Sequence, residues 1–131
     1  MEGSEQVLDI IESLQSDDFR DYDLVLTTRR IVLIHTRSLR LPELGLAKGG
    51  WWGWAPDIST LDELLQKDEN SYAINYAEID EIKLHKGVLG SKLVLESRGS
   101  QKIFVFDKNF EKIYTMLLQT PALEGKVSIS R

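Results

Sequence analysis

Three tryptophans, Trp51, Trp52 and Trp54, carry the most distinctive binding chemistry in this chain of 131 residues. Each indole ring offers a large apolar surface and one N–H donor, and glycines stand beside the rings in the sequence. Three such side chains cannot easily all enter one core. We interpret the cluster as mainly structural, covering the predicted sheet. The alternatives are a contact with a protein partner or a second copy, and an anchor at a membrane interface.

A second candidate site is basic. Arg29 and Arg30 stand at the turn of a predicted hairpin, and a planar guanidinium group can bind two phosphate oxygens at once. Four further cations from other segments complete this candidate anion site: Arg37, Lys83, Lys86 and Lys92. The simpler interpretation is a solvated charged surface, and the functional alternative is a site for an anionic lipid headgroup.

The sequence lacks the residue patterns of catalytic and metal sites. His35 and His85 are the only histidines, and neither has a further ligand or an orienting carboxylate at a characteristic spacing. The chain has no cysteine, no Gly-x-Ser-x-Gly motif and no phosphate-binding loop. The sequence therefore predicts a protein that is not an enzyme and that needs no cofactor or metal.

The formal net charge of −5 is unevenly distributed along the chain. Residues 1–28 and 49–81 each carry −7, whereas residues 29–48 and 82–112 each carry +4. Nucleic-acid binding needs many cationic contacts to phosphate, so this acidic chain is not expected to bind nucleic acid. No signal-peptide pattern and no run of ~20 apolar residues occur, so we expect a cytoplasmic protein, with peripheral attachment to a membrane as an alternative.

We expect one domain over 1–131, beginning with a helix. Apolar residues at positions i, i+3, i+4 and i+7 predict an N-terminal helix within residues 1–20. These residues are Val7, Ile10, Ile11 and Leu14. So short an amphipathic helix must dock on another element, because it cannot be stable alone in water.

Two blocks of strands are predicted, at 22–41 and 71–106, with an irregular insertion at 42–70 between them. In the first block, two β-branched runs flank the arginine pair and predict a hairpin. The second block alternates apolar and polar residues between glycine turns, which is typical of antiparallel hairpins. The insertion contains the tryptophans and a short predicted helix at 59–66.

The last predicted element is a C-terminal helix over 109–119. Five apolar residues at helical spacing form its inner face: Phe110, Ile113, Tyr114, Leu117 and Leu118. Pro121 ends the helix, and the tail beyond it is expected to be frayed.

The order of these elements resembles that of a known family. The run Leu24-Val-Leu-Thr-Thr-Arg-Arg-Ile-Val-Leu-Ile resembles the first hairpin of bacterial pleckstrin-homology-like (PH-like) and GRAM-like domains. Tyr76-Ala-Glu-Ile-Asp-Glu-Ile is similar to the element that leads into their second block of strands, and Lys83 to Phe106 is similar to its meander. The resemblance covers about residues 22–119, apart from the insertion.

The resemblance implies a fold and a class of function. The expected fold is α+β: an antiparallel PH-like open barrel or curved sheet with a C-terminal helix, an extra N-terminal helix and a helical Trp-rich insertion. The expected function is non-catalytic binding that mediates protein–protein contact or self-assembly. The alternative is a peripheral membrane domain that binds anionic lipid of the phosphoinositide type, because family members that bind inositol phosphates use basic residues near the first hairpin.

Overall fold

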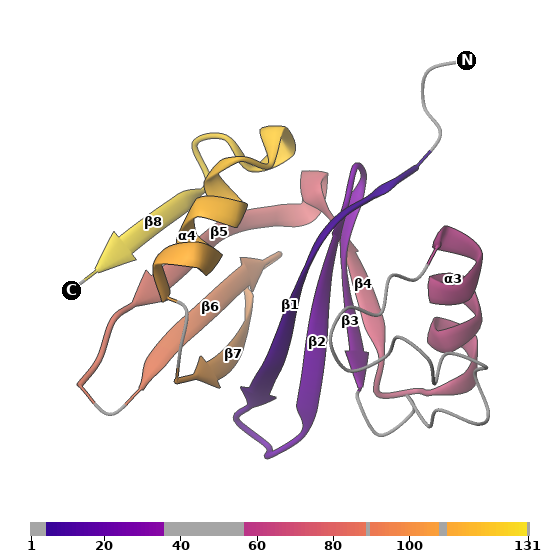
Figure 1. Ribbon diagram of the computed structural model, residues 1–131, viewed down its shortest axis with the longest axis horizontal. Helices are drawn as coiled ribbons and strands as arrows, with labels where there is room; N and C mark the ends of the chain where they lie inside the picture. Colours follow the sequence, from indigo (N-terminus) through magenta and orange to yellow (C-terminus); the bar gives the residue numbers. More distant parts are fainter. Residues whose placement is uncertain (1–4, 36–56, 89, 108–109, 131) are drawn as a thin grey trace.

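The computed structural model describes residues 5–35, 57–88, 90–107 and 110–130. Within these residues, eight strands form one mixed sheet in the order β4-β3-β2-β1-β7-β6-β5-β8 (Figure 1). The strands are β1 (Val7–Ser16), β2 (Asp21–Thr27), β3 (Arg30–His35), β4 (Tyr72–Asn75), β5 (Ile79–His85), β6 (Ser91–Ser97), β7 (Ser100–Phe106) and β8 (Val127–Ser130). The other described elements are the helices α3 (Ile58–Lys67) and α4 (Phe110–Leu118) and the short 3₁₀ helices η2 (Tyr76–Glu78) and η3 (Pro121–Leu123).

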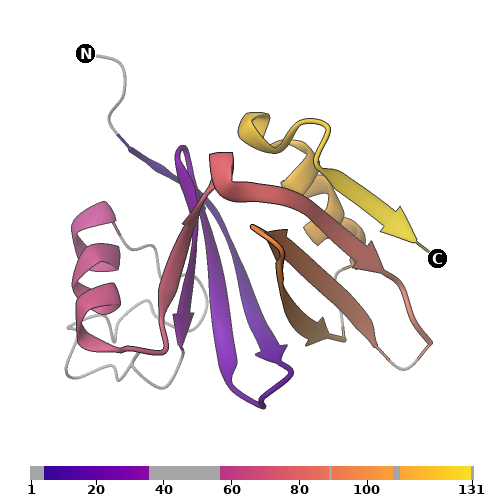
Figure 2. The ribbon, with the colours of Figure 1, turned by 180° about the vertical axis from the view of Figure 1, so that it is seen from behind.

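The sheet consists of two halves, β4-β3-β2-β1 and β7-β6-β5-β8. Only two residue pairs join them, Gln15 with Val105 and Ser16 with Phe104. Figures 1 and 2 show the two halves as two groups of strands, with η2 carrying the chain from β4 to β5. All neighbouring strands run antiparallel except β5 and β8, which run parallel.

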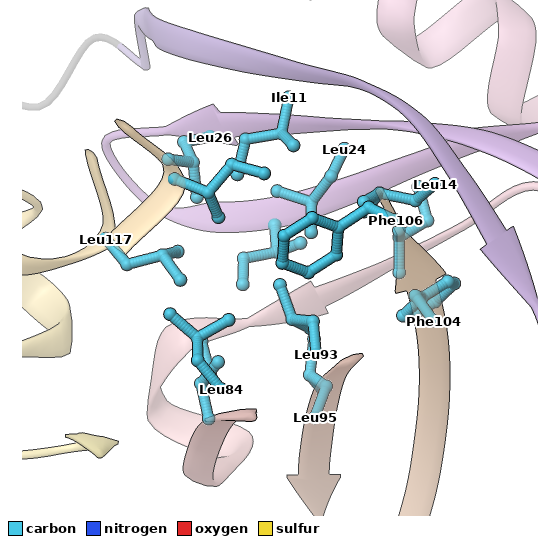
Figure 3. Close-up of a cluster of buried hydrophobic side chains, with 14 of the residues drawn as sticks. Ile11, Leu14, Leu24, Leu26, Leu84, Leu93, Leu95, Phe104, Phe106 and Leu117 are labelled. Carbon is cyan, nitrogen blue, oxygen red and sulfur yellow. The ribbon is translucent and has the colours of Figure 1, made fainter. Parts of the chain in front are cut away.

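The main hydrophobic core lies between the two halves. Leu24 and Leu26 of β2 lie across the core from Leu84 of β5 and Leu93 of β6 (Figure 3). Leu117 of α4 is fully buried in the same cluster. Burial of apolar surface from both halves therefore holds them together, although the ladder between them is short.

A smaller hydrophobic cluster lies on the opposite face of the first half, where α3 covers the sheet. Leu61 and Leu64 of α3 pack against a cluster that includes Val25 of β2. The side chain of Asp57 caps the helix by accepting a hydrogen bond from the backbone N–H of Thr60 at 2.8 Å. The first half is thus covered on both faces.

The predicted helix within residues 1–20 is wrong, because this segment forms β1. The pairing of β1 with β2 shifts register between Val7 and Asp9 and again between Ile11 and Leu14. Each shift adds one residue to β1, as in a β-bulge, and reverses the alternation of the side chains that follow. Ile11 and Leu14, three positions apart, consequently both enter the main core. The bulges give this strand the apolar spacing of a helix.

The predicted fold class is also wrong. The described chain is mostly β structure, and the parallel pairing of β8 with β5 makes the sheet mixed rather than antiparallel. The insertion at 42–70 contributes α3, which carries no tryptophan. Trp51, Trp52 and Trp54 lie outside the described residues. The tail after Pro121 is not frayed but forms η3 and β8.

Several single elements match their predictions. The first hairpin is confirmed as β2 and β3, and the second block of strands is confirmed as β4 to β7. The helices predicted at 59–66 and 109–119 are present as α3 and α4. Among the described residues, no helix is both long and apolar enough to cross a membrane.

Candidate functional site

A polar cleft opens at the end of the sheet where its two halves part. Its volume is about 230 Å³, and it lies between the β1–β2 turn, the loop that precedes β4, and β7. We call it the mouth cleft. Its lining residues are Ser16, Asp17, Asp18, Arg20, Tyr22, Glu69, Asn70, Tyr72, Lys102, Ile103 and Phe104. The cleft therefore combines segments that are far apart in the sequence.

Three aromatic rings form the floor of the mouth cleft. The ring of Tyr22 meets those of Tyr72 and Phe104 edge to face, with centroids 6.0 and 5.8 Å away. The Tyr22 hydroxyl donates a hydrogen bond to the backbone carbonyl of Asn70 at 2.9 Å. Because Tyr22 and Phe104 are almost completely buried, the floor is held in place by the core beneath it.

The β1–β2 turn forms one wall. The hydroxyl of Ser16 donates to the carboxylate of Asp18, which also forms an ion pair with Arg20. The Ser16 hydrogen bond and the Arg20 charge hold the pKa of Asp18 below its usual value. At the tip, Phe19 has a left-handed backbone (φ 67°), and the residue is 82% exposed. A bulky residue rarely adopts this conformation, so the turn presents an apolar ring to solvent at some cost in strain.

Charged side chains surround the aromatic floor. The ammonium group of Lys102 lies 5.4 Å from the centroid of the Tyr72 ring, in a cation–π contact. Burial, together with Tyr22 and the nearby Asp18 and Asp17, raises the pKa of Tyr72, so its phenol stays neutral. The lining holds three carboxylates and two cations, and Arg20 is paired with one of those carboxylates.

A histidine–aspartate pair lies next to the mouth cleft but is not part of its lining. His35 Nδ1 lies 3.0 Å from Asp68 Oδ2, and the backbone N–H of His35 donates to the Ser71 hydroxyl at 2.8 Å. Burial by itself raises the pKa of Asp68, but the backbone N–H of Asn70 and the His35 ring outweigh it and leave this pKa lowered. The pair joins the end of β3 to the end of α3. It therefore supports the wall of the cleft from behind.

The predicted arginine pair is divided between two environments. Arg29 is exposed at the β2–β3 turn. Arg30 instead donates from Nε to Glu5 and from its terminal nitrogen to Asp62, both at 2.8 Å. The Thr27 hydroxyl donates to the same Glu5 oxygen at 2.6 Å. The guanidinium of Arg30 is thus used within the protein, where it ties the segment before β1 and the β2–β3 hairpin to α3.

The predicted lysines lie elsewhere. Lys83 forms an ion pair with Glu96 at 3.1 Å, and Lys86 lies 3.7 Å from Glu111. Lys92 is exposed on β6. Figures 1 and 2 place these strands in the other half of the sheet from the β2–β3 turn, so the structure does not gather the described basic residues into one patch. Arg37 and the three tryptophans lie outside the described residues.

Sequence reasoning missed the mouth cleft. The available signal was the run Ser16-Asp-Asp-Phe-Arg between two apolar segments. Four of its five residues are polar, which is typical of a hairpin turn but equally of the end of a helix. The described residues contain no group of three or more histidines and carboxylates that could hold a metal ion. A scan against models of protein families found no match, and a search of the curated proteins found none either.

Proposed function

We propose that this protein is a non-catalytic binding module that mediates protein–protein contact through the mouth cleft. The observation that carries the proposal is the aromatic floor inside a cleft of about 230 Å³. Sites for whole small-molecule ligands usually measure roughly 300–1,000 Å³. The mouth cleft therefore suits one large side chain of a partner better than a complete cofactor. Buried aromatic pockets that receive one anchor side chain are typical of energetically dominant positions in protein interfaces.

The surroundings of the cleft support a binding role rather than catalysis. His35, the histidine nearest to it, is buried against Tyr22 and Asp68 and does not line the cleft. A cytoplasmic location, with the partner presented either in solution or at a membrane surface, belongs to the same proposal.

Anionic lipid binding has less support from the geometry. Phosphate recognition needs several cations that converge on one point. Arg30 and Lys83 form ion pairs with carboxylates of the protein. Arg29 lies between β2 and β3, in the other half of the sheet from Lys83. Association with a second copy remains within the proposal, because an identical chain is one possible protein partner.

Selection from a library of displayed random heptapeptides tests the proposal. Glu69 lines the cleft and is exposed, so Glu69→Trp places a large ring at its entrance. Glu63, exposed on α3, supplies the matched control Glu63→Trp. We expect enriched peptides that bind the wild-type protein and Glu63→Trp equally but lose at least tenfold in affinity for Glu69→Trp. Failure to enrich peptides that distinguish the two variants would overturn the proposal.

Two further measurements separate the other classes of partner. Light scattering at two salt concentrations gives the molar mass. A multiple of 15.0 kDa that Glu69→Trp reduces would identify a second copy as the partner. Sedimentation with vesicles of phosphatidylserine and phosphatidylcholine tests lipid binding. Binding to vesicles that Arg29→Ala abolishes and Glu69→Trp leaves intact would replace the proposal with the lipid alternative.

A further inference from the structure

The β6–β7 hairpin determines which backbone groups of β7 face the mouth cleft. Ser97 and Ser100 pair across a two-residue turn, in which Arg98 and Gly99 both have positive φ angles, 54° and 83°. In such a hairpin the closing pair is hydrogen-bonded across the two strands, and bonded and non-bonded pairs then alternate. Ser100 and every second residue after it therefore direct their backbone groups toward β6. The residues between them face the opposite edge.

That opposite edge of β7 is only partly used by the sheet. Val105 pairs there with Gln15, and β1 makes no further pair beyond Phe104 because its chain turns away after Ser16. By the alternation above, the backbone N–H and C=O groups of Ile103 face the same edge, and no strand of the described chain lies opposite them. Ile103 also lines the mouth cleft. The cleft thus has an open strand edge as one side.

The charge around the cleft is predominantly negative. The two acidic segments of the sequence, 1–28 and 49–81, meet here, the first through Asp17 and Asp18 and the second through Glu69. Asp18 is neutralised by Arg20, which leaves Asp17 and Glu69 facing the single cation of Lys102. A field of this sign attracts cationic partners and repels anionic ones.

The protein already places one cation over the aromatic floor. Lys102 is an exposed side chain of β7, and its ammonium group stands over the ring of Tyr72. Tyrosine rings attract cations through the negative face of the π system, and the nearby carboxylates add to this attraction. Because Lys102 is a long, exposed side chain, it can swing into solvent when another cation takes its position.

We propose that the mouth cleft takes an extended peptide segment, which pairs with the open edge of β7 and places a Lys or Arg side chain over the Tyr72 ring in exchange for Lys102. This inference rests on the proposed function and specifies its partner. Backbone pairing supplies sequence-independent affinity, and the anchor side chain supplies specificity, as in other cases of strand addition to a sheet edge. A lysine side chain is also of a size that the cleft can hold.

The test uses the full chain labelled with ¹⁵N and four acetylated and amidated peptides. These are Thr-Val-Lys-Val-Thr and its variants with Arg, norleucine or Glu at the centre. We expect the Lys and Arg peptides to shift the amide signals of Asp17, Glu69 and Ile103, and to bind at least fivefold more tightly than the norleucine peptide. The Glu peptide should bind most weakly. Equal binding of all four peptides would overturn the inference.

Protein variants test the exchange of cations. Lys102→Met should tighten binding of the Lys peptide about two- to fivefold, because a like charge is removed, and Glu69→Gln should weaken it by a similar factor. Lys112, exposed on α4, and Glu63, exposed on α3, do not line the cleft, so Lys112→Met and Glu63→Gln are the matched controls. Tighter binding of the Glu peptide than of the Lys peptide to the wild-type protein would mean that Lys102 is itself the ligand-binding group.

N-methylation of the peptide backbone tests the strand pairing. Methylation of the amides that face β7 should abolish binding, whereas methylation of the alternate amides should leave it within twofold. Equal loss from both would exclude pairing with the edge. In the display selection, peptides that need an open cleft but lack a common Lys or Arg would overturn this inference while the proposed function stands. Failure to enrich any cleft-dependent peptide would overturn both.

Discussion

The substitution Arg30→Met tests whether the predicted basic site is in fact a structural ion pair. Met keeps the length and apolar character of the stem but removes the charge and all donors. Two contacts are lost: one to Glu5, whose side chain is 11% exposed, and one to Asp62, whose side chain is 51% exposed. Glu5 would keep only the Thr27 hydroxyl as a hydrogen-bond donor from this network. A carboxylate would thus be left largely buried without its counter-charge.

The two contacts differ in their expected contributions. Loss of one partner of a fully buried pair costs about 3–5 kcal/mol. Arg30 and Glu5 retain some exposure, 18% and 11%, and Thr27 still donates, so we expect about 2–3 kcal/mol for this contact. The half-exposed contact to Asp62 should contribute less than about 1 kcal/mol. For a chain of this size, the total corresponds to a fall in Tm of about 10 °C.

Urea unfolding followed by circular dichroism measures the free energy of unfolding directly. Asp62→Asn removes only the exposed contact and is the matched control, with an expected loss below about 1 kcal/mol. In a Glu5→Gln background, Arg30→Met should cost less than in the wild-type protein, because no buried carboxylate is left unpaired. If Arg30→Met destabilises the protein no more than Asp62→Asn, or by the same amount in both backgrounds, the buried pair is not a stabilising element.

Three further predictions concern other parts of the fold. Tyr76→Phe removes the hydroxyl that donates to the Thr27 carbonyl at 2.6 Å and should cost about 1–2 kcal/mol in urea unfolding; an unchanged midpoint would contradict this. Burial raises the pKa of Tyr22, Tyr72 and Tyr76, so the folded state holds these protons more tightly than the unfolded chain does. These groups should therefore leave the free energy of unfolding unchanged below about pH 10 and lower it above that pH. A constant free energy of unfolding up to about pH 11 would contradict the raised pKa values of the three tyrosines. Gly99 has φ +83°, a conformation that alanine adopts only with strain, so Gly99→Ala should lower the free energy of unfolding by about 1 kcal/mol, measured by thermal unfolding. An added Cβ would meet no atom within 4 Å, so no clash adds to this loss.

Local sequence patterns were sufficient to predict an element where the periodicity of its apolar residues matches the face that it buries in the core. Ile82 and Leu84 alternate with Lys83 and His85, and β5 places the first two in the core. In α4, Phe110, Ile113 and Leu117 of the predicted inner face are buried, whereas Leu118, predicted to belong to it, is 53% exposed. In both elements a regular backbone carries the sequence pattern directly onto one face.

β8 could not be predicted from local pattern. It has four residues, and its apolar positions Val127 and Ile129 are only half-buried. So short a strand forms because β5 offers it a parallel ladder, in which the backbone N–H of Ile82 donates to the carbonyl of Lys126 at 2.8 Å. The connection from β5 to β8 that makes a parallel pair possible runs through β6, β7, α4 and η3, and no local sequence pattern predicts such a long-range return.

The mouth cleft could not be predicted from the sequence for a related reason. Its lining comes from the β1–β2 turn, the loop before β4, and β7, and each of these segments by itself is an ordinary polar turn or strand. The uneven charge of the sequence was visible, but only the fold shows that the two acidic segments meet. Asp17 and Glu69, 52 positions apart, line one cleft because β4 returns to the same half of the sheet as β1.

The feature that misled the sequence prediction of β1 also shapes the junction beside the candidate site. A β-bulge bends its strand and increases the local twist. The second bulge of β1 lies between Ile11 and Leu14, directly before the two residues that pair with β7. The bend before Gln15 lets β1 meet β7 only from Gln15 onward, and the turn after Ser16 then ends the ladder, which leaves the edge of β7 open at Ile103. The helix-like spacing of apolar residues in β1 is therefore the sequence signature of the bulges that precede this two-pair ladder, next to the mouth cleft.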